Sequence, residues 1–151
     1  MWNRRFDSIV RDSRFQRLVS ANLLWSFTHF AYVLVSGWVV FLLTNSPVKV
    51  ILLTFFQFSA LPIVGLFAGS LIDRIGSRTI MILSQLIYTL IYLCIAVLIF
   101  LDMLAFWHLA SAAVVTGLCW AIDWPARRSI LADVVGENKV SDGYIIDYSV
   151  Q

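Results

Sequence analysis

The stretch GSLIDRIGSR, residues 69–78, is a short charged turn between two apolar segments that are each long enough to cross a bilayer. Asp73, Arg74 and Arg78 supply its charges, and Gly76 suits a turn that needs a positive φ angle. Charged side chains avoid the hydrocarbon core, so the turn should lie at a membrane surface. The segments before and after it are therefore expected to cross the membrane in opposite directions.

The composition agrees with a membrane location. Of the 151 residues, 60% are hydrophobic and 13% are charged, and the mean hydropathy is +0.85. Ordinary soluble domains have an apolar share of about 45–50% and about 25% charged residues. The two cysteines, Cys94 and Cys119, fall inside apolar segments and do not indicate a disulfide framework. The chain is thus expected to lie in the lipid bilayer.

Four apolar segments have the length of membrane-spanning helices, since a helix needs about 20 residues to cross a hydrocarbon core of about 30 Å. Spanning strands would be shorter and would alternate in polarity, which these segments do not. Residues 1–17 form a basic N-terminal segment, and residues 123–151 form a cytoplasmic loop and the start of a fifth helix. The prediction is an all-α membrane protein with four transmembrane helices, at residues 18–43, 50–72, 79–101 and 104–122.

The basic residues indicate the orientation of these helices. Ten of the eleven would lie on one side of the membrane, and only Lys49 would lie on the other. Short loops rich in lysine and arginine stay in the cytoplasm, so the N-terminus and the 73–78 turn are expected there. The external turns would be residues 44–49 and Asp102 with Met103.

Several motifs, taken in order, resemble the major facilitator superfamily of transporters. The 69–78 turn is similar to that superfamily's loop between helices two and three, which reads Gly, three residues, Asp, Arg or Lys, any residue, Gly, then basic residues. Ser77 departs from the pattern, because a second basic residue is common there. Four further segments look like the macrolide-efflux and enterobactin-exporter branch: residues 14–18, 43–47, 61–62 and 125–135.

The resemblance implies a fold and a function. Complete members have twelve helices in two six-helix halves around a midplane site. This chain would be a fragment, part of the N-terminal half, with a missing C-terminal portion as its partner. The resemblance also implies efflux of a drug-like or siderophore-like small molecule from the bacterial inner membrane, with protons as the coupling ion.

The charged turn is the predicted conformational switch. Gly65 and Gly69 form a Gly-x-x-x-Gly pair, which permits close approach of another helix. Asp123 is the expected acidic partner of Arg74 or Arg78, because it ends the fourth segment on the same side. In the superfamily such a network latches the two halves in the outward-facing state; a solvated topological turn is the alternative. The switch candidates are Gly69, Asp73, Arg74, Gly76, Arg78 and Asp123.

Candidates for the substrate and proton pathway lie mainly in the first helix. A polar and aromatic stripe recurs there at spacings of three and four, so it should face protein or water. His29 near mid-span is a candidate proton carrier, although a hydrogen bond to the next helix explains it equally well. The stripe consists of Asn22, Trp25, Ser26, His29, Tyr32 and Ser36.

Weaker pathway candidates lie in the other helices. Gln57, Gln85 and Trp120 would line a cavity or bridge helices, and bridging is the commoner use of such residues. Pro125 is expected to kink the chain or to start a new helix, because the residue before a proline avoids helical geometry. A last helical segment is predicted from Val140 onwards.

The sequence carries no sign of other functions. It has no phosphate-binding glycine loop, no metal-spaced His and Cys cluster and no nucleophile beside a base, so neither an enzyme, a metal nor a cofactor is expected. Its arginines flank helices instead of forming a nucleic-acid patch. Two alternatives stay open. The first is a small dimeric four-helix exporter, which would need an essential glutamate in the first helix, where this chain has no acid. The second is a membrane component that does not transport.

Overall fold

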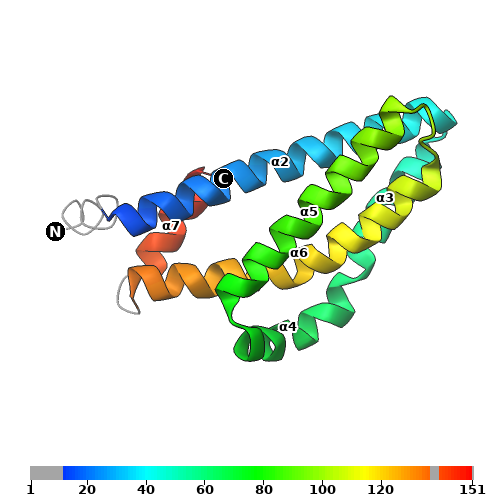
Figure 1. Ribbon diagram of the computed structural model, residues 1–151. Helices are drawn as coiled ribbons and strands as arrows, with labels where there is room; N and C mark the ends of the chain where they lie inside the picture. Colours follow the sequence, from blue (N-terminus) through cyan, green and yellow to red (C-terminus); the bar gives the residue numbers. More distant parts are fainter. Residues whose placement is uncertain (1–11, 137–139, 151) are drawn as a thin grey trace. The chain divides into compact units, whose positions relative to one another are not determined.

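A computed structural model describes residues 12–136 and 140–150. Within them the chain forms six helices and no strand (Figure 1), as predicted for an all-α protein. The predicted count of four transmembrane helices is reached only if two bent segments form one span, because three single helices are long and apolar enough to cross a membrane. The helices are α2 (Ser13–Thr44), α3 (Pro47–Ser59), α4 (Leu61–Ile75), α5 (Ser77–Phe100), α6 (Phe106–Val135) and α7 (Val140–Val150).

The chain divides into two compact units. Among the described residues, the terminal unit comprises 12–33, 128–136 and 140–150, and the central unit comprises 34–127. Helices α2 and α6 each contribute one part to either unit. The predicted orientation also counted four basic residues that lie outside the described part of the chain: Arg4, Arg5, Arg11 and Lys139.

The predicted single helix at residues 50–72 is interrupted. Helix α3 ends at Ser59 and α4 begins at Leu61. The segments Pro47–Ser59 and Val64–Ile75 are bent by 44° relative to each other. Pro62 lies in the first turn of α4, where it lacks the N–H group that would bond the carbonyl of Phe58. The proline therefore starts a new helix at this point.

Pro125 does not start a new helix, because α6 continues through it to Val135. An ion pair between Asp123 and Arg127 bridges the proline on the same helix. Ala126, directly after the proline, is fully buried. Packing and the ion pair thus offset the backbone hydrogen bond that Pro125 cannot donate.

Three turns lie where the sequence predicted them. Asn45 and Asp102 have φ angles of 48° and 53°, and both residue types tolerate this left-handed region. Gly76 has a φ of 88° between α4 and α5, which confirms the need for glycine there. Gly136 ends α6 with a φ of 79°, and α7 then begins at Val140, as predicted.

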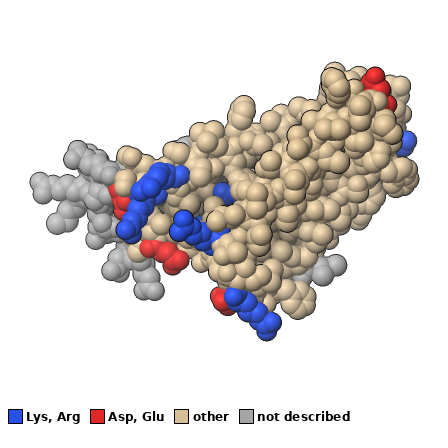
Figure 2. Space-filling view, viewed as in Figure 1, with Lys and Arg blue, Asp and Glu red and all other residues tan. Residues whose placement is uncertain are grey.

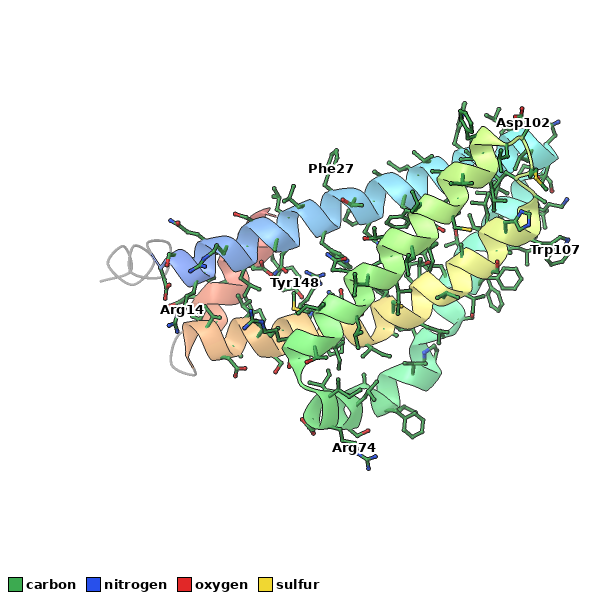
Figure 3. The ribbon with its side chains drawn as sticks, in the orientation of Figure 1. Arg14, Phe27, Arg74, Asp102, Trp107 and Tyr148 are labelled. Atoms are coloured by element: carbon green, nitrogen blue, oxygen red, sulfur yellow. The ribbon has the colours of Figure 1, made fainter. Side chains whose placement is uncertain are left out.

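Both units have small interior clusters and strongly apolar surfaces. The central cluster contains Val40, Leu53, Leu109 and Ala113, and the terminal one is built around Phe15 and Leu131. Figure 2 shows broad areas of the surface without charged side chains. Within the central unit, Figure 3 places Arg74 at one end and Asp102 with Trp107 at the other. A broad apolar surface between charged ends is what a bilayer requires.

Candidate functional site

The residues of the charged turn are exposed to solvent in this chain. Asp73, Arg74 and Arg78 lie around the junction of α4 and α5, and their side chains form no ion pair with the described residues. Figure 3 shows Arg74 pointing away from the helices. A Cβ atom built on Gly65 or Gly69 would meet nothing within 4 Å. The close helix contact predicted for this glycine pair is therefore not made by the part of the chain described.

Asp123 has a different partner from the one predicted. Its Oδ2 atom accepts a hydrogen bond of 2.7 Å from Nε of Arg127, not from Arg74 or Arg78. The side chains of Asp123 and Arg127 are 0% and 6% exposed. Residues four apart lie on one face of a helix, so the pair forms without help from another segment. The Asp-x-x-x-Arg spacing was the signal for Arg127, and the expectation of a kink or a new helix start at Pro125 concealed it.

A buried polar interior accompanies this pair in the central unit. Gln57 of α3, Ser84 and Tyr88 of α5, and Thr116 of α6 are all at most 5% exposed. The hydroxyl of Tyr88 donates a long hydrogen bond of 3.5 Å to the carbonyl of Thr116. Helices α5 and α6 are thus joined by polar as well as apolar contacts, as interhelical contacts in membranes often are.

Gln57 and Trp120, both predicted pathway candidates, lie where α3 contacts α6. A Cβ atom on Gly117 would lie 1.9 Å from the backbone oxygen of Gln57, so only glycine fits at this crossing. Trp120 packs edge-on against Phe58 of α3, with ring centroids 5.5 Å apart, and stacks on Trp124. The side chain of Trp120 thus joins α6 to α3, and Gln57 lies with its backbone at the crossing of the same two helices.

Gln85 is not brought into this interior. It lies on the exposed side of α5, where its backbone carbonyl accepts a hydrogen bond from Thr89. Its neighbour Ser84 occupies the buried position instead. One residue turns a helix by about 100°, so hydropathy alone did not distinguish these two neighbours.

The polar stripe of α2 is buried, as predicted for a face turned away from lipid. Asn22, Ser26, His29 and Ser36 are 8% exposed or less, and Trp25 is 9% exposed. The rings of Trp25 and His29 stack with centroids 5.3 Å apart. The apolar residues between them point outward, with exposures of 75% for Phe27, 61% for Phe30 and 74% for Leu34. Tyr32, the remaining member of the stripe, is half-buried.

The terminal unit brings α7 against this stripe. Nδ2 of Asn22 donates a hydrogen bond of 3.1 Å to Oδ1 of Asp147, and both residues are buried. Sequence reasoning missed Asp147, although a single acid between Ile146 and Tyr148 is a visible signal in an apolar helix. The contact gives Asn22 a defined polar partner.

Aromatic residues of α7 also hold the end of α6. The hydroxyl of Tyr144 donates to the carbonyl of Arg128 at 3.1 Å. The Arg128 guanidinium donates to the hydroxyl of Tyr148 and lies 5.7 Å from the centre of its ring. These contacts fix α7 on the last turns of α6 within the terminal unit (Figure 1).

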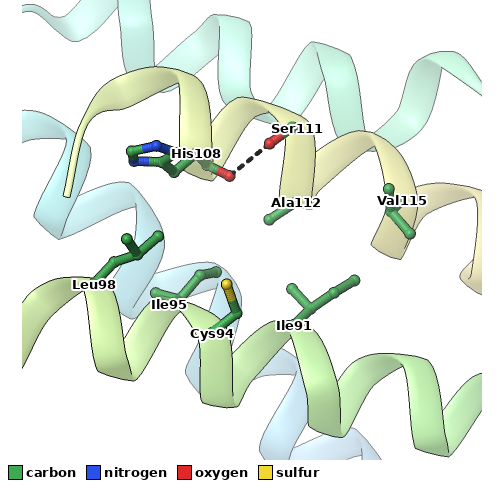
Figure 4. Close-up of a pocket in the computed structure, with 8 residues that line it drawn as sticks. All are labelled: Ile91, Cys94, Ile95, Leu98, His108, Ser111, Ala112 and Val115. Carbon is green, nitrogen blue, oxygen red and sulfur yellow. Dashed lines mark hydrogen bonds between the residues drawn. The ribbon is translucent and has the colours of Figure 1, made fainter. Parts of the chain in front are cut away.

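A pocket of about 200 Å³ lies between α5 and α6 in the central unit (Figure 4). Its lining is aliphatic apart from Cys94, His108 and Ser111. None of the predicted switch or pathway residues lines it. This pocket is therefore separate from the buried polar interior described above.

Comparison with known proteins adds one finding. A family model described as transmembrane secretion effector, of the major facilitator type, matches residues 8–149. Neither a curated protein nor a solved structure matches the chain.

Proposed function

Because this chain belongs to the transmembrane secretion effector family, of the major facilitator type, we propose that it forms the N-terminal portion of a proton-coupled exporter. The family and the apolar helices make the chain a multi-pass membrane protein of a transporter type and point away from an enzyme. The proposed substrate is a drug-like or siderophore-like small molecule. The proposed location is the bacterial inner membrane, with the N-terminus in the cytoplasm.

The reversed polarity of α2 carries this proposal. Its polar and aromatic stripe is buried, whereas Phe27 and Leu34 are about three-quarters exposed. A soluble helix has the opposite arrangement, with its polar face outward. Intramembrane polar side chains face a bundle interior or a water-filled cavity and mark transport pathways. The stripe, with His29 and Asn22, is thus the proposed inner face of the substrate or proton pathway.

The charged turn is the proposed conformational switch. Asp73, Arg74 and Arg78 are exposed and make no ion pair with the described residues, so their charges are accessible to another segment of a complete transporter. A carboxylate at a membrane surface can stabilise the positive N-terminal end of a neighbouring helix. A contact present in one conformation alone would bias the transport cycle.

The proposed orientation predicts which turns an impermeant thiol reagent can reach in intact cells. Variants Asn45→Cys and Ser77→Cys are made in a chain whose Cys94 and Cys119 are replaced by alanine. We expect labelling at position 45 and none at position 77, because the proposed topology would put ten of the eleven basic residues on the side of the 73–78 turn. Labelling at position 77 without labelling at position 45 would reverse the orientation.

The proposed partial fold predicts that residues 1–151 insert into the membrane and do not transport alone. Major facilitator substrate sites lie between two six-helix halves, so one part of one half cannot alternate access. In liposomes with a pH gradient, the purified chain should accumulate no more ethidium or macrolide than empty liposomes do. Gradient-dependent accumulation by the chain alone would contradict the proposal and favour the dimeric small exporter.

A further inference from the structure

We propose that Asp123 is a proton-binding site of the central unit, with Oδ1 as the atom that takes up the proton and Arg127 as the residue that holds Oδ2. The biological role of this site depends on the proposed proton-coupled export. Proton binding itself can be measured without transport, so the two proposals can fail separately.

The two carboxylate oxygens of Asp123 have unequal surroundings. Oδ2 accepts the 2.7 Å hydrogen bond from Arg127. Oδ1 is fully buried and accepts no hydrogen bond from the described residues. Leaving a charged oxygen buried without a donor is costly, and protonation lowers this cost by neutralising the group. Oδ1 is thus the atom at which proton uptake removes the cost of a buried charge without a donor.

The neighbourhood of Asp123 holds few groups that compete for the proton. Among the described residues of the central unit, the titratable side chains that interact electrostatically with it are Tyr88 of α5 and Cys119 and Arg127 of α6. Tyrosine and cysteine are neutral near pH 7, which leaves Arg127 as the charged neighbour among these three. Helix α3 contributes the amide Gln57 to this interior, and an amide does not titrate.

Uptake of one proton changes the charge of the pair without breaking a covalent bond. An O–H bond forms at Oδ1, and the net charge of Asp123 and Arg127 rises from zero to +1. The attraction that holds Arg127 is then weakened. Ionisable residues inside membrane bundles commonly serve as proton relays. A change in their charge changes the relative stability of the conformations of the protein.

Infrared difference spectroscopy of the 151-residue chain in liposomes tests the site. A protonated carboxyl group has a C=O band of its own, and we expect one such band to gain intensity as the pH is lowered. Asp123→Asn should abolish that band. The matched control is Asp133→Asn on the same helix, where the carboxylate is exposed, and it should leave the band unchanged.

Arg127 provides a second test that keeps the carboxyl group in place. In Arg127→Gln the positive charge is lost, the charged form of Asp123 is disfavoured, and the midpoint of the band should rise by about 1–3 pH units. Arg127→Lys should restore most of the original midpoint. A band that survives Asp123→Asn, disappears in Asp147→Asn instead, or does not shift in Arg127→Gln would overturn the proposal. If Asp123 binds a proton in a complete protein and that protein does not export, the result would contradict the proposed function and leave the proton-binding site standing.

Discussion

Gly117→Ala is expected to disrupt the packing of α6 against α3. The added Cβ would lie 1.9 Å from the backbone oxygen of Gln57 and 2.8 Å from its carbonyl carbon. Backbone atoms cannot rotate away as a flexible side chain can, so the two helices must separate. Overpacking of this kind costs about 1–3 kcal/mol or more. The loss should appear as a lower unfolding midpoint of the purified chain during denaturation in detergent.

Gly65→Ala is the matched control for this substitution. Gly65 is also a helical glycine, in α4, but its Cβ would have open space. Alanine favours a helix over glycine by about 1 kcal/mol, so this variant should be as stable as the parent or slightly more stable. Equal stability of Gly117→Ala and Gly65→Ala would show that α3 and α6 do not cross as described.

Asp73→Asn is expected to suppress transport in a complete transporter that carries this chain, while membrane insertion stays normal. The substitution removes the charge and keeps the size of the side chain, so it affects the proposed switch contact rather than the turn itself. A contact made in one conformation typically contributes a coupling free energy equivalent to about a 5-fold to 150-fold effect. Uptake by inverted vesicles with a pH gradient measures this loss.

The control for Asp73→Asn is the same change at Asp102. Asp102 is exposed, lies at the other end of the central unit and has a positive φ that asparagine also tolerates (Figure 3). Asp102→Asn should therefore transport at the parental rate. Parental transport by Asp73→Asn as well would reduce Asp73 to a marker of topology.

Local features of the sequence predicted much of this structure. The turns at Asn45, Gly76 and Asp102 and the start of α7 lie where short-range residue preferences placed them. The stripe of α2 is buried as its spacing predicted. Each of these features depends on residues within a few positions of one another, so one segment contains the information needed.

The errors concern positions where local preference and packing compete. Pro125 was expected to kink the chain or to start a new helix, yet α6 passes through it as one helix beside the buried pair of Asp123 and Arg127. Pro62, in contrast, starts α4 after the break at Ala60. The same residue type therefore has two outcomes. Contacts of the neighbouring side chains keep the helix continuous at Pro125 and not at Pro62.

The sequence by itself determined that this is an apolar helical chain, where it turns and which face of α2 is polar, because hydropathy, periodicity and turn preferences act over a few residues. The tertiary structure alone decided which distant residues meet. It placed Gly117, not Gly65 or Gly69, at a close helix contact, and it gave Asn22 the partner Asp147. Such contacts depend on the positions of whole helices, which no local pattern specifies.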